Sequence, residues 1–105
     1  MPQSSLEKSL IIYKDKVLGD ITNVSYDFPW SYGTFSERAD FEKYRDGFIH
    51  LMTDDYDDEL LLSIDPDIFD AEHWSIKTSD GQISPIEPPS IHPLESHIDW
   101  QFTSR

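Results

Sequence analysis

Apolar and polar residues alternate along two neighbouring stretches near the N-terminus, residues 9–14 and 17–26, which are separated only by Asp15 and Lys16. A period of two is typical of β-strands that have one buried face and one solvated face. Two such stretches joined by a tight connection predict an antiparallel hairpin.

The apolar spacing changes to a helical period in the middle of the chain. Five apolar residues recur at intervals of three, four, three and one: Phe41, Tyr44, Phe48, Leu51 and Met52. This spacing places them on one face of an amphipathic helix. Thr34 and Glu37 have the spacing of a capping box, and Ser36 is an alternative N-cap, so the predicted helix covers about residues 37–53.

Turn-forming residues divide the second half of the chain into short elements. Asp65-Pro66-Asp67 interrupts regular structure, because proline lacks the backbone donor that a helix needs. Ser79-Asp80-Gly81 separates two strands predicted at residues 73–78 and 82–86, and Asp-Gly is a preferred hairpin turn. Residues 91–102 then predict a short strand, a turn and a final strand.

In this order, the elements predict an α+β fold: an antiparallel sheet of about five strands with one or two helices packed on one face. Residues 54–63 are compatible with either a helix or a loop. The length of 105 residues suits a single domain, in which we expect residues 1–8 to be a frayed N-terminus. The longest apolar runs, residues 10–12 and 60–62, are far shorter than the ~20 residues that cross a bilayer.

The charge is concentrated in the second half of the chain. The net charge is −13, yet residues 1–45 hold seven acids and six bases, whereas residues 46–105 hold fourteen acids and only Lys77 and Arg105 as bases. So negative a protein is not expected to bind nucleic acid or an anionic membrane directly, because like charges repel. Charge of one sign on one region predicts either an interaction face or a solvated tail.

The acidic half predicts a protein-interaction domain that docks a basic partner, as immunity proteins and inhibitors do. Residues 54–59 hold five carboxylates in six positions, with an aromatic ring between them to act as an apolar anchor. The residues expected to contact the partner are Asp54, Asp55, Tyr56, Asp57, Asp58, Glu59, Asp65, Asp67 and Asp70. The alternative, that the acids only keep the domain soluble, stays open.

Two other functions are weaker alternatives. If residues 54–59 were helical, they would carry one charge per ~1.8 Å, close to the ~1.7 Å of duplex DNA, but the charges would fan around the helix axis. A DNA mimic needs them on one face. A metal-dependent enzyme could use the carboxylates and the four histidines, but no spacing typical of metal ligands occurs. The chain has no cysteine, nucleophile elbow or glycine-rich phosphate loop, so we expect no cofactor and no catalysis.

Aromatic residues gather around a proline and a glycine between the predicted hairpin and helix. The members of this segment are Phe28, Pro29, Trp30, Tyr32, Gly33 and Phe35. Pro29 disfavours a helix at the residue before it, and Gly33 permits a turn. We expect the segment to turn a corner and fill the core with its rings. The alternative is an exposed aromatic anchor for a partner.

The same segment, Asp27-Phe28-Pro29-Trp30-x-Tyr32-Gly33-x-Phe35, resembles a group of small uncharacterised bacterial proteins. In that group a DFPW-x-x-G-x-F segment links a β-hairpin to a helix. The run Trp74…Asp80-Gly81…Pro88-Pro89…Ile98-x-Trp100 is similar to the C-terminal strands of the group. The resemblance covers about residues 10–52 and 72–102. It implies a bacterial cytoplasmic protein, and it implies no activity, because none is established for the group.

Overall fold

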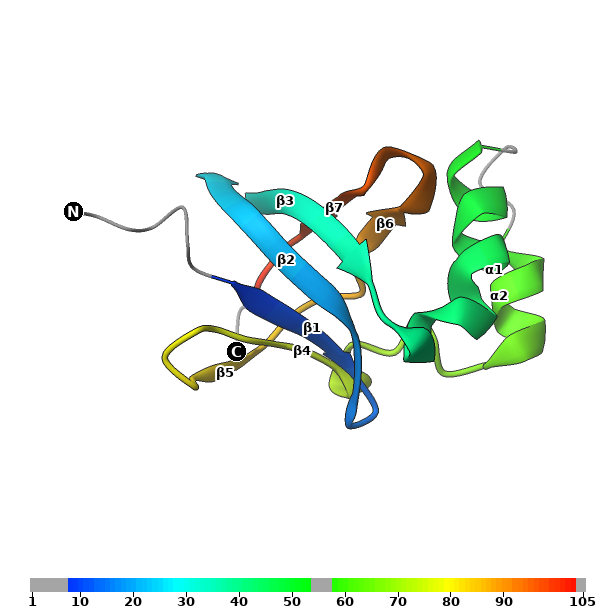
Figure 1. The fold of residues 1–105 in the computed structure, drawn as a ribbon. Helices are drawn as coiled ribbons and strands as arrows, with labels where there is room; N and C mark the ends of the chain where they lie inside the picture. Colours follow the sequence, from blue (N-terminus) through cyan, green and yellow to red (C-terminus); the bar gives the residue numbers. More distant parts are fainter. Residues whose placement is uncertain (1–7, 54–57, 104–105) are drawn as a thin grey trace.

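The computed structural model describes residues 8–53 and 58–103, which form one antiparallel sheet and two helices (Figure 1). The strands are β1 (Ser9–Tyr13), β2 (Lys16–Asp27), β3 (Trp30–Glu37), β4 (Trp74–Lys77), β5 (Ile83–Pro85), β6 (Ser90–His92) and β7 (His97–Trp100). The helices are α1 (Glu42–Thr53) and α2 (Glu59–Ile64), and 3-10 turns lie at η2 (Ala39–Phe41), η3 (Ala71–His73) and η4 (Pro93–Glu95).

The α+β class is as predicted, but the strand number is not. Over the described residues the sheet has seven strands in the order β5-β4-β1-β2-β3-β7-β6, rather than about five. The prediction missed β3, where residues after Pro29 pair with β2 along most of their length. The sequence pattern hides this strand because small residues, Ser31 and Gly33, occupy two of its three buried positions.

The N-terminal hairpin forms as the alternation predicts, but its turn lies one residue earlier than the predicted Asp15-Lys16 connection, because Lys16 already pairs with Tyr13. Lys14 and Asp15 make the turn, and both have positive φ, 50° and 67°. Such a turn has the twist that two antiparallel strands need. The β1–β2 register shifts between Ile11 and Ile12, so that Leu18 is an extra residue in β2. Leu18 is fully buried, and the bulge therefore adds one more apolar side chain to the core.

The sheet curves so strongly that the chain after β5, at one edge, pairs with the chain after β7, near the other edge. Ile86, directly after β5, donates its backbone N–H to the Trp74 carbonyl of β4 and forms a β-bridge with Phe102, beyond the end of β7. The backbone N–H of Glu87 donates to the Gln101 carbonyl beside this bridge. These bonds join the β4–β5 side of the sheet to the C-terminal extension of β7, and the sheet wraps around its core.

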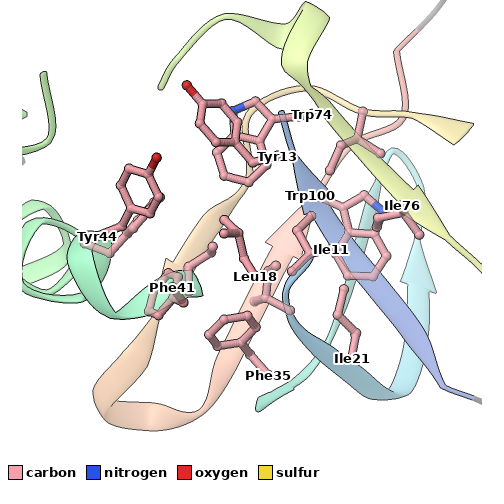
Figure 2. Close-up of a cluster of buried hydrophobic side chains, with 14 of the residues drawn as sticks. Ile11, Tyr13, Leu18, Ile21, Phe35, Phe41, Tyr44, Trp74, Ile76 and Trp100 are labelled. Atoms are coloured by element: carbon pink, nitrogen blue, oxygen red, sulfur yellow. The ribbon is translucent and has the colours of Figure 1, made fainter. Parts of the chain in front are cut away.

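One apolar cluster fills the inside of the curved sheet and continues to α1. Figure 2 shows aromatic rings from different elements converging there, among them Tyr13, Trp74 and Trp100. The rings of Phe35 and Phe41 meet edge-to-face, with centroids 5.0 Å apart, and so connect β3 with the turn that precedes α1. Edge-to-face contacts stabilise beyond the burial of area alone.

Helix α1 (Glu42–Thr53) is the predicted amphipathic helix, but it begins at Glu42 rather than near residue 37, and the residues directly after Thr53 lie outside the described part of the chain. Thr34 and Glu37, the predicted capping box, lie in β3 and pair with β2. The Thr34 hydroxyl accepts a hydrogen bond from Asn23 Nδ2, and the Glu37 carboxylate pairs with Arg45, so the two side chains have partners other than a helix end. The two helices lie at the end of the molecule away from the β2–β3 turn (Figure 1). None of the described helices is long and apolar enough to cross a lipid bilayer.

The helices approach closely at Gly47. A Cβ atom at this position would lie 2.6 Å from Cδ2 of Leu61 in α2, so only glycine leaves room for the buried leucine. Helix α2 ends at Ile64, directly before Asp65-Pro66, as the proline predicts. The chain then returns to β4 and makes the predicted Asp80-Gly81 turn between β4 and β5.

Candidate functional site

The DFPW segment forms the tip of the β2–β3 hairpin, and β3 has an inverted pattern of burial. Ser31 and Gly33 point inward and are buried, whereas Trp30 and Tyr32 point outward, with 44% and 37% of their surface exposed. A Cβ atom at Gly33 would lie 2.8 Å from Cγ2 of Ile21 on β2. The inner face of β3 therefore has room only for small side chains at these positions, and the large rings face solvent.

The prediction that this segment fills the core is wrong for three of its four rings. Phe28, at the tip of the hairpin, is 95% exposed, and Trp30 and Tyr32 lie on the outer face. Phe35 alone is buried, against Phe41. The exposure of the other three is what the alternative, an aromatic anchor for a partner, requires.

An open groove with a volume of about 680 Å³ lies beside the hairpin tip. Three parts of the chain line it: the β2–β3 hairpin, the connection from β5 to β6, and the residues that follow β7. Its main aromatic and polar side chains are Tyr26, Phe28, Trp30, Phe102, Glu87 and Gln101. The closure of the sheet at Ile86 and Phe102 creates this site, because it brings the second and third segments to the hairpin.

The groove combines exposed rings with hydrogen-bond acceptors. Tyr26 is 70% exposed and Phe102 is 42% exposed. Glu87 is the one charged residue among the described lining residues, and none of them is basic. Thr103 Oγ1 is buried and has no hydrogen-bond partner in the described chain. The arrangement fits a ligand that stacks on aromatic rings and donates hydrogen bonds.

The acidic residues expected to bind a partner are found in different surroundings. Residues 54–57, the first part of the acidic segment, lie outside the described residues. Asp58 is the N-cap residue of α2, and Glu59 lies in its first turn. Negative charge at this end of a helix is favourable, because the helix dipole is positive there.

Asp65 is bonded within the fold. Its Oδ2 accepts hydrogen bonds from Tyr13 Oη at 2.9 Å and Tyr44 Oη at 3.2 Å, and its Oδ1 lies 3.3 Å from Lys14 Nζ. Although burial opposes ionisation, bonds from the Asp67 backbone N–H, Tyr13 and Lys14 lower the pKa of Asp65 below its ordinary value. Burial, together with the bond to Asp65, raises the pKa of Tyr44 to about 12. Sequence spacing gives no signal for this network.

The next two acids after Asp65 also have intramolecular partners. Asp67 Oδ2 lies 3.0 Å from Lys14 Nζ, and the Asp70 carboxylate accepts a bond from the Glu72 backbone N–H at the start of η3. The carboxylates of Asp65, Asp67 and Asp70 therefore hold the segment between α2 and β4 in place. Their contribution to a partner surface stays a prediction.

Within the described residues, the histidines do not build a metal centre with the carboxylates. His92 and His97, opposite each other on β6 and β7, have their Nε2 atoms 3.7 and 3.4 Å from Asp99 Oδ2. No group of three or more histidine, aspartate or glutamate side chains in residues 8–53 and 58–103 is arranged to hold a metal ion. The described residues thus offer no observation in favour of the metal-dependent enzyme.

No family model, curated protein or solved structure matches this chain. The resemblance to bacterial proteins with a DFPW-x-x-G-x-F segment stays a prediction. A function for this protein must therefore be argued from the geometry of the groove and the charge of the chain.

Proposed function

We propose that this protein is a non-catalytic interaction domain that binds a basic partner through the aromatic groove. The exposure of large rings around the groove carries the proposal, above all Phe28 at 95% and Tyr26 at 70%. A group of exposed apolar side chains is typical of a binding site, and tryptophan and tyrosine dominate the binding energy of many interfaces.

The charge of the chain supports a basic partner. Twenty-one acids against eight bases produce a negative field around the molecule, and the groove itself has a carboxylate and no cation among its described lining residues. Such a field attracts a positive surface, accelerates encounter and rejects acidic competitors. In this proposal the acids steer the partner, and the aromatic groove supplies most of the short-range binding energy.

A DNA mimic has no comparable support. That function depends on the geometry of residues 54–59, of which only Asp58 and Glu59 are described. The aromatic groove favours a protein ligand, because rings and acceptors in a concave site can enclose a side chain.

The test is a selection from phage that display random 12-residue peptides, carried out at physiological salt on three immobilised proteins. These are the wild-type protein, a groove variant with Phe28→Ser and Trp30→Ser, and a control variant with Leu94→Ser. All three have the same net charge, and Leu94 is an exposed apolar residue of η4 that does not line the groove. Circular dichroism confirms that each variant is folded.

We expect the wild-type protein and the Leu94→Ser control to enrich peptides rich in arginine and lysine, and the groove variant to enrich none. Equal enrichment by all three proteins would mean that charge alone retains the peptides, and it would overturn the proposal. The absence of enriched peptides on the wild-type protein would also overturn it.

A further inference from the structure

We infer that the groove recognises an arginine side chain on the partner protein, with the guanidinium stacked on the aromatic rings and paired with Glu87. This inference rests on the proposed function and names the chemistry of its ligand. Arginine has a planar cation with five N–H donors, which can stack on a ring and bind oxygen atoms in its own plane at the same time.

The aromatic rings supply the stacking surfaces. Trp30 and Phe28 belong to the hairpin, and Phe102 belongs to the segment that follows β7, so aromatic groups from two parts of the chain line the groove. A cation within about 6 Å of the face of such a ring is attracted by its negative π-surface, most strongly for tryptophan. Lysine also has a cation, but it is compact, strongly hydrated and cannot stack.

Glu87 supplies the countercharge. Its backbone is fixed by the bond from its N–H to the Gln101 carbonyl, next to the bridge between Ile86 and Phe102. The backbone on which the carboxylate stands is therefore held by strand pairing. A guanidinium can form two parallel hydrogen bonds with a carboxylate, which is stronger and more directional than a single bond. A neutral ligand in the groove would desolvate Glu87 without pairing it, which is unfavourable.

Thr103 adds an independent reason to expect a hydrogen-bond donor. Thr103 is one of the residues that line the groove, and its Oγ1 is buried without a hydrogen-bond partner in the described chain. A buried hydroxyl without a partner is unfavourable, and a donor from the ligand would relieve this. The guanidinium has enough N–H groups to reach a carboxylate and a hydroxyl together.

The two arginines of a second copy that lie in the described residues are poor candidates for the ligand. Arg38 is paired with Asp20 at 2.7 Å and Arg45 with Glu37 at 3.0 Å. Each would have to break its own ion pair to enter a groove on another molecule. The proposal assigns the arginine to a different protein; Arg105 lies outside the described residues, and the sedimentation control below covers association through it.

The experiment is an NMR titration of the 15N-labelled protein with four blocked nine-residue peptides that differ only in the central residue: arginine, lysine, citrulline or glutamine. We expect the arginine peptide to bind about fivefold more tightly than the lysine peptide. The citrulline peptide, which has the shape of arginine without its charge, should bind at least tenfold more weakly. The largest shifts should be at the Trp30 indole N–H and the backbone amides of Glu87, Gln101 and Thr103.

Two variants test the countercharge under matched conditions. Glu87→Gln should lower the affinity for the arginine peptide about tenfold, and Glu72→Gln should leave this affinity unchanged. Glu72 is exposed and lies in η3, next to the β1–β2 turn and at the opposite end of β2 from the hairpin tip. Both substitutions remove one negative charge, so a difference between them measures position and not net charge. Sedimentation at the same concentrations checks that the protein does not associate with itself.

Several outcomes would overturn the inference and leave the proposed function intact. One is equal affinity for the arginine and lysine peptides, and another is an equal effect of Glu87→Gln and Glu72→Gln. A third is a set of shifts confined to α1 and α2. If none of the four peptides binds while the phage selection still yields groove ligands, arginine is the wrong ligand. If the selection yields none, the proposed function itself is wrong.

Discussion

The two ends of strand β2 have opposite surroundings: polar groups pair with one another near the β1–β2 turn, and apolar rings are exposed at the β2–β3 turn. Near the β1–β2 turn, Asp65 is bonded by Tyr13, Tyr44 and Lys14, so polar groups with complementary charges satisfy one another. At the β2–β3 turn, Phe28 is 95% exposed. The first end uses charge to hold the fold together, whereas the second leaves apolar rings in water.

The difference teaches that the acidic character of the chain is a poor guide to its binding site. Asp65 and Asp67, which the sequence places on a partner surface, have intramolecular ionic partners. Trp30 and Tyr32, which the sequence places in the core, lie on the surface. The comparison predicts that substitutions near the β1–β2 turn reduce stability, and that substitutions at the hairpin tip reduce binding and leave stability almost unchanged.

The largest effect is expected from Asp65→Ala. The variant leaves the hydroxyl groups of Tyr13 and Tyr44 without their acceptor, and Tyr13 is almost completely buried. We expect the free energy of unfolding to fall by about 2–3 kcal/mol, measured by urea denaturation. Asp67→Ala removes an exposed ion pair with Lys14 and should lower it by less than about 1 kcal/mol. Equal losses for the two variants would contradict the role assigned to Asp65.

Gly33→Ala tests why the rings of Trp30 and Tyr32 in β3 face outward. The added methyl group would lie 2.8 Å from Cγ2 of Ile21 and 2.8 Å from the Thr22 carbonyl oxygen. We expect a loss of about 1–3 kcal/mol in the free energy of unfolding, because neighbouring atoms must move. Ser36→Ala, at an exposed position of the same strand, should change it by less than about 0.5 kcal/mol. A neutral Gly33→Ala would show that the inner face of β3 has room for larger side chains.

Trp30→Ala should separate binding from stability. The indole is 44% exposed. Its loss should lower the affinity for a groove ligand selected from the phage library by at least about tenfold. Phe28→Ala, at the 95% exposed tip, should change the midpoint of thermal unfolding by no more than about 2 °C. A cooperative unfolding transition lost in either variant would mean that the hairpin rings support the fold after all.

The smallest effect is a change in acid stability. Because the folded protein lowers the pKa of Asp65 below the ordinary 3.8, the ionised carboxylate stabilises the fold at pH values above that, and this contribution is lost as the pH falls through the lowered pKa. Asp65→Asn should therefore lose less stability than the wild-type protein when the pH is reduced from about 5 to about 3. Urea denaturation at both pH values provides the comparison. Parallel losses in the two proteins would show that other groups account for the acid sensitivity.

Much of the fold follows from local sequence. The alternation in residues 9–14 and 17–26 produces a hairpin, Pro66 ends a helix, and Asp80-Gly81 makes a turn. Each of these features depends on neighbouring residues, whose backbone preferences and side-chain spacing are visible in the sequence. The helical spacing from Phe41 onward also predicts α1.

The site depends on contacts between residues far apart in the chain, which only the tertiary structure decides. Asp65 accepts a hydrogen bond from Tyr13, which lies 52 positions away in the chain. The bridge between Ile86 and Phe102 brings Glu87 beside the hairpin. The sequence determines that aromatic rings gather around Pro29, but pairing with β2 decides which way they face. Gly33 packs directly on Ile21, so the small residues turn inward and the rings must turn to solvent.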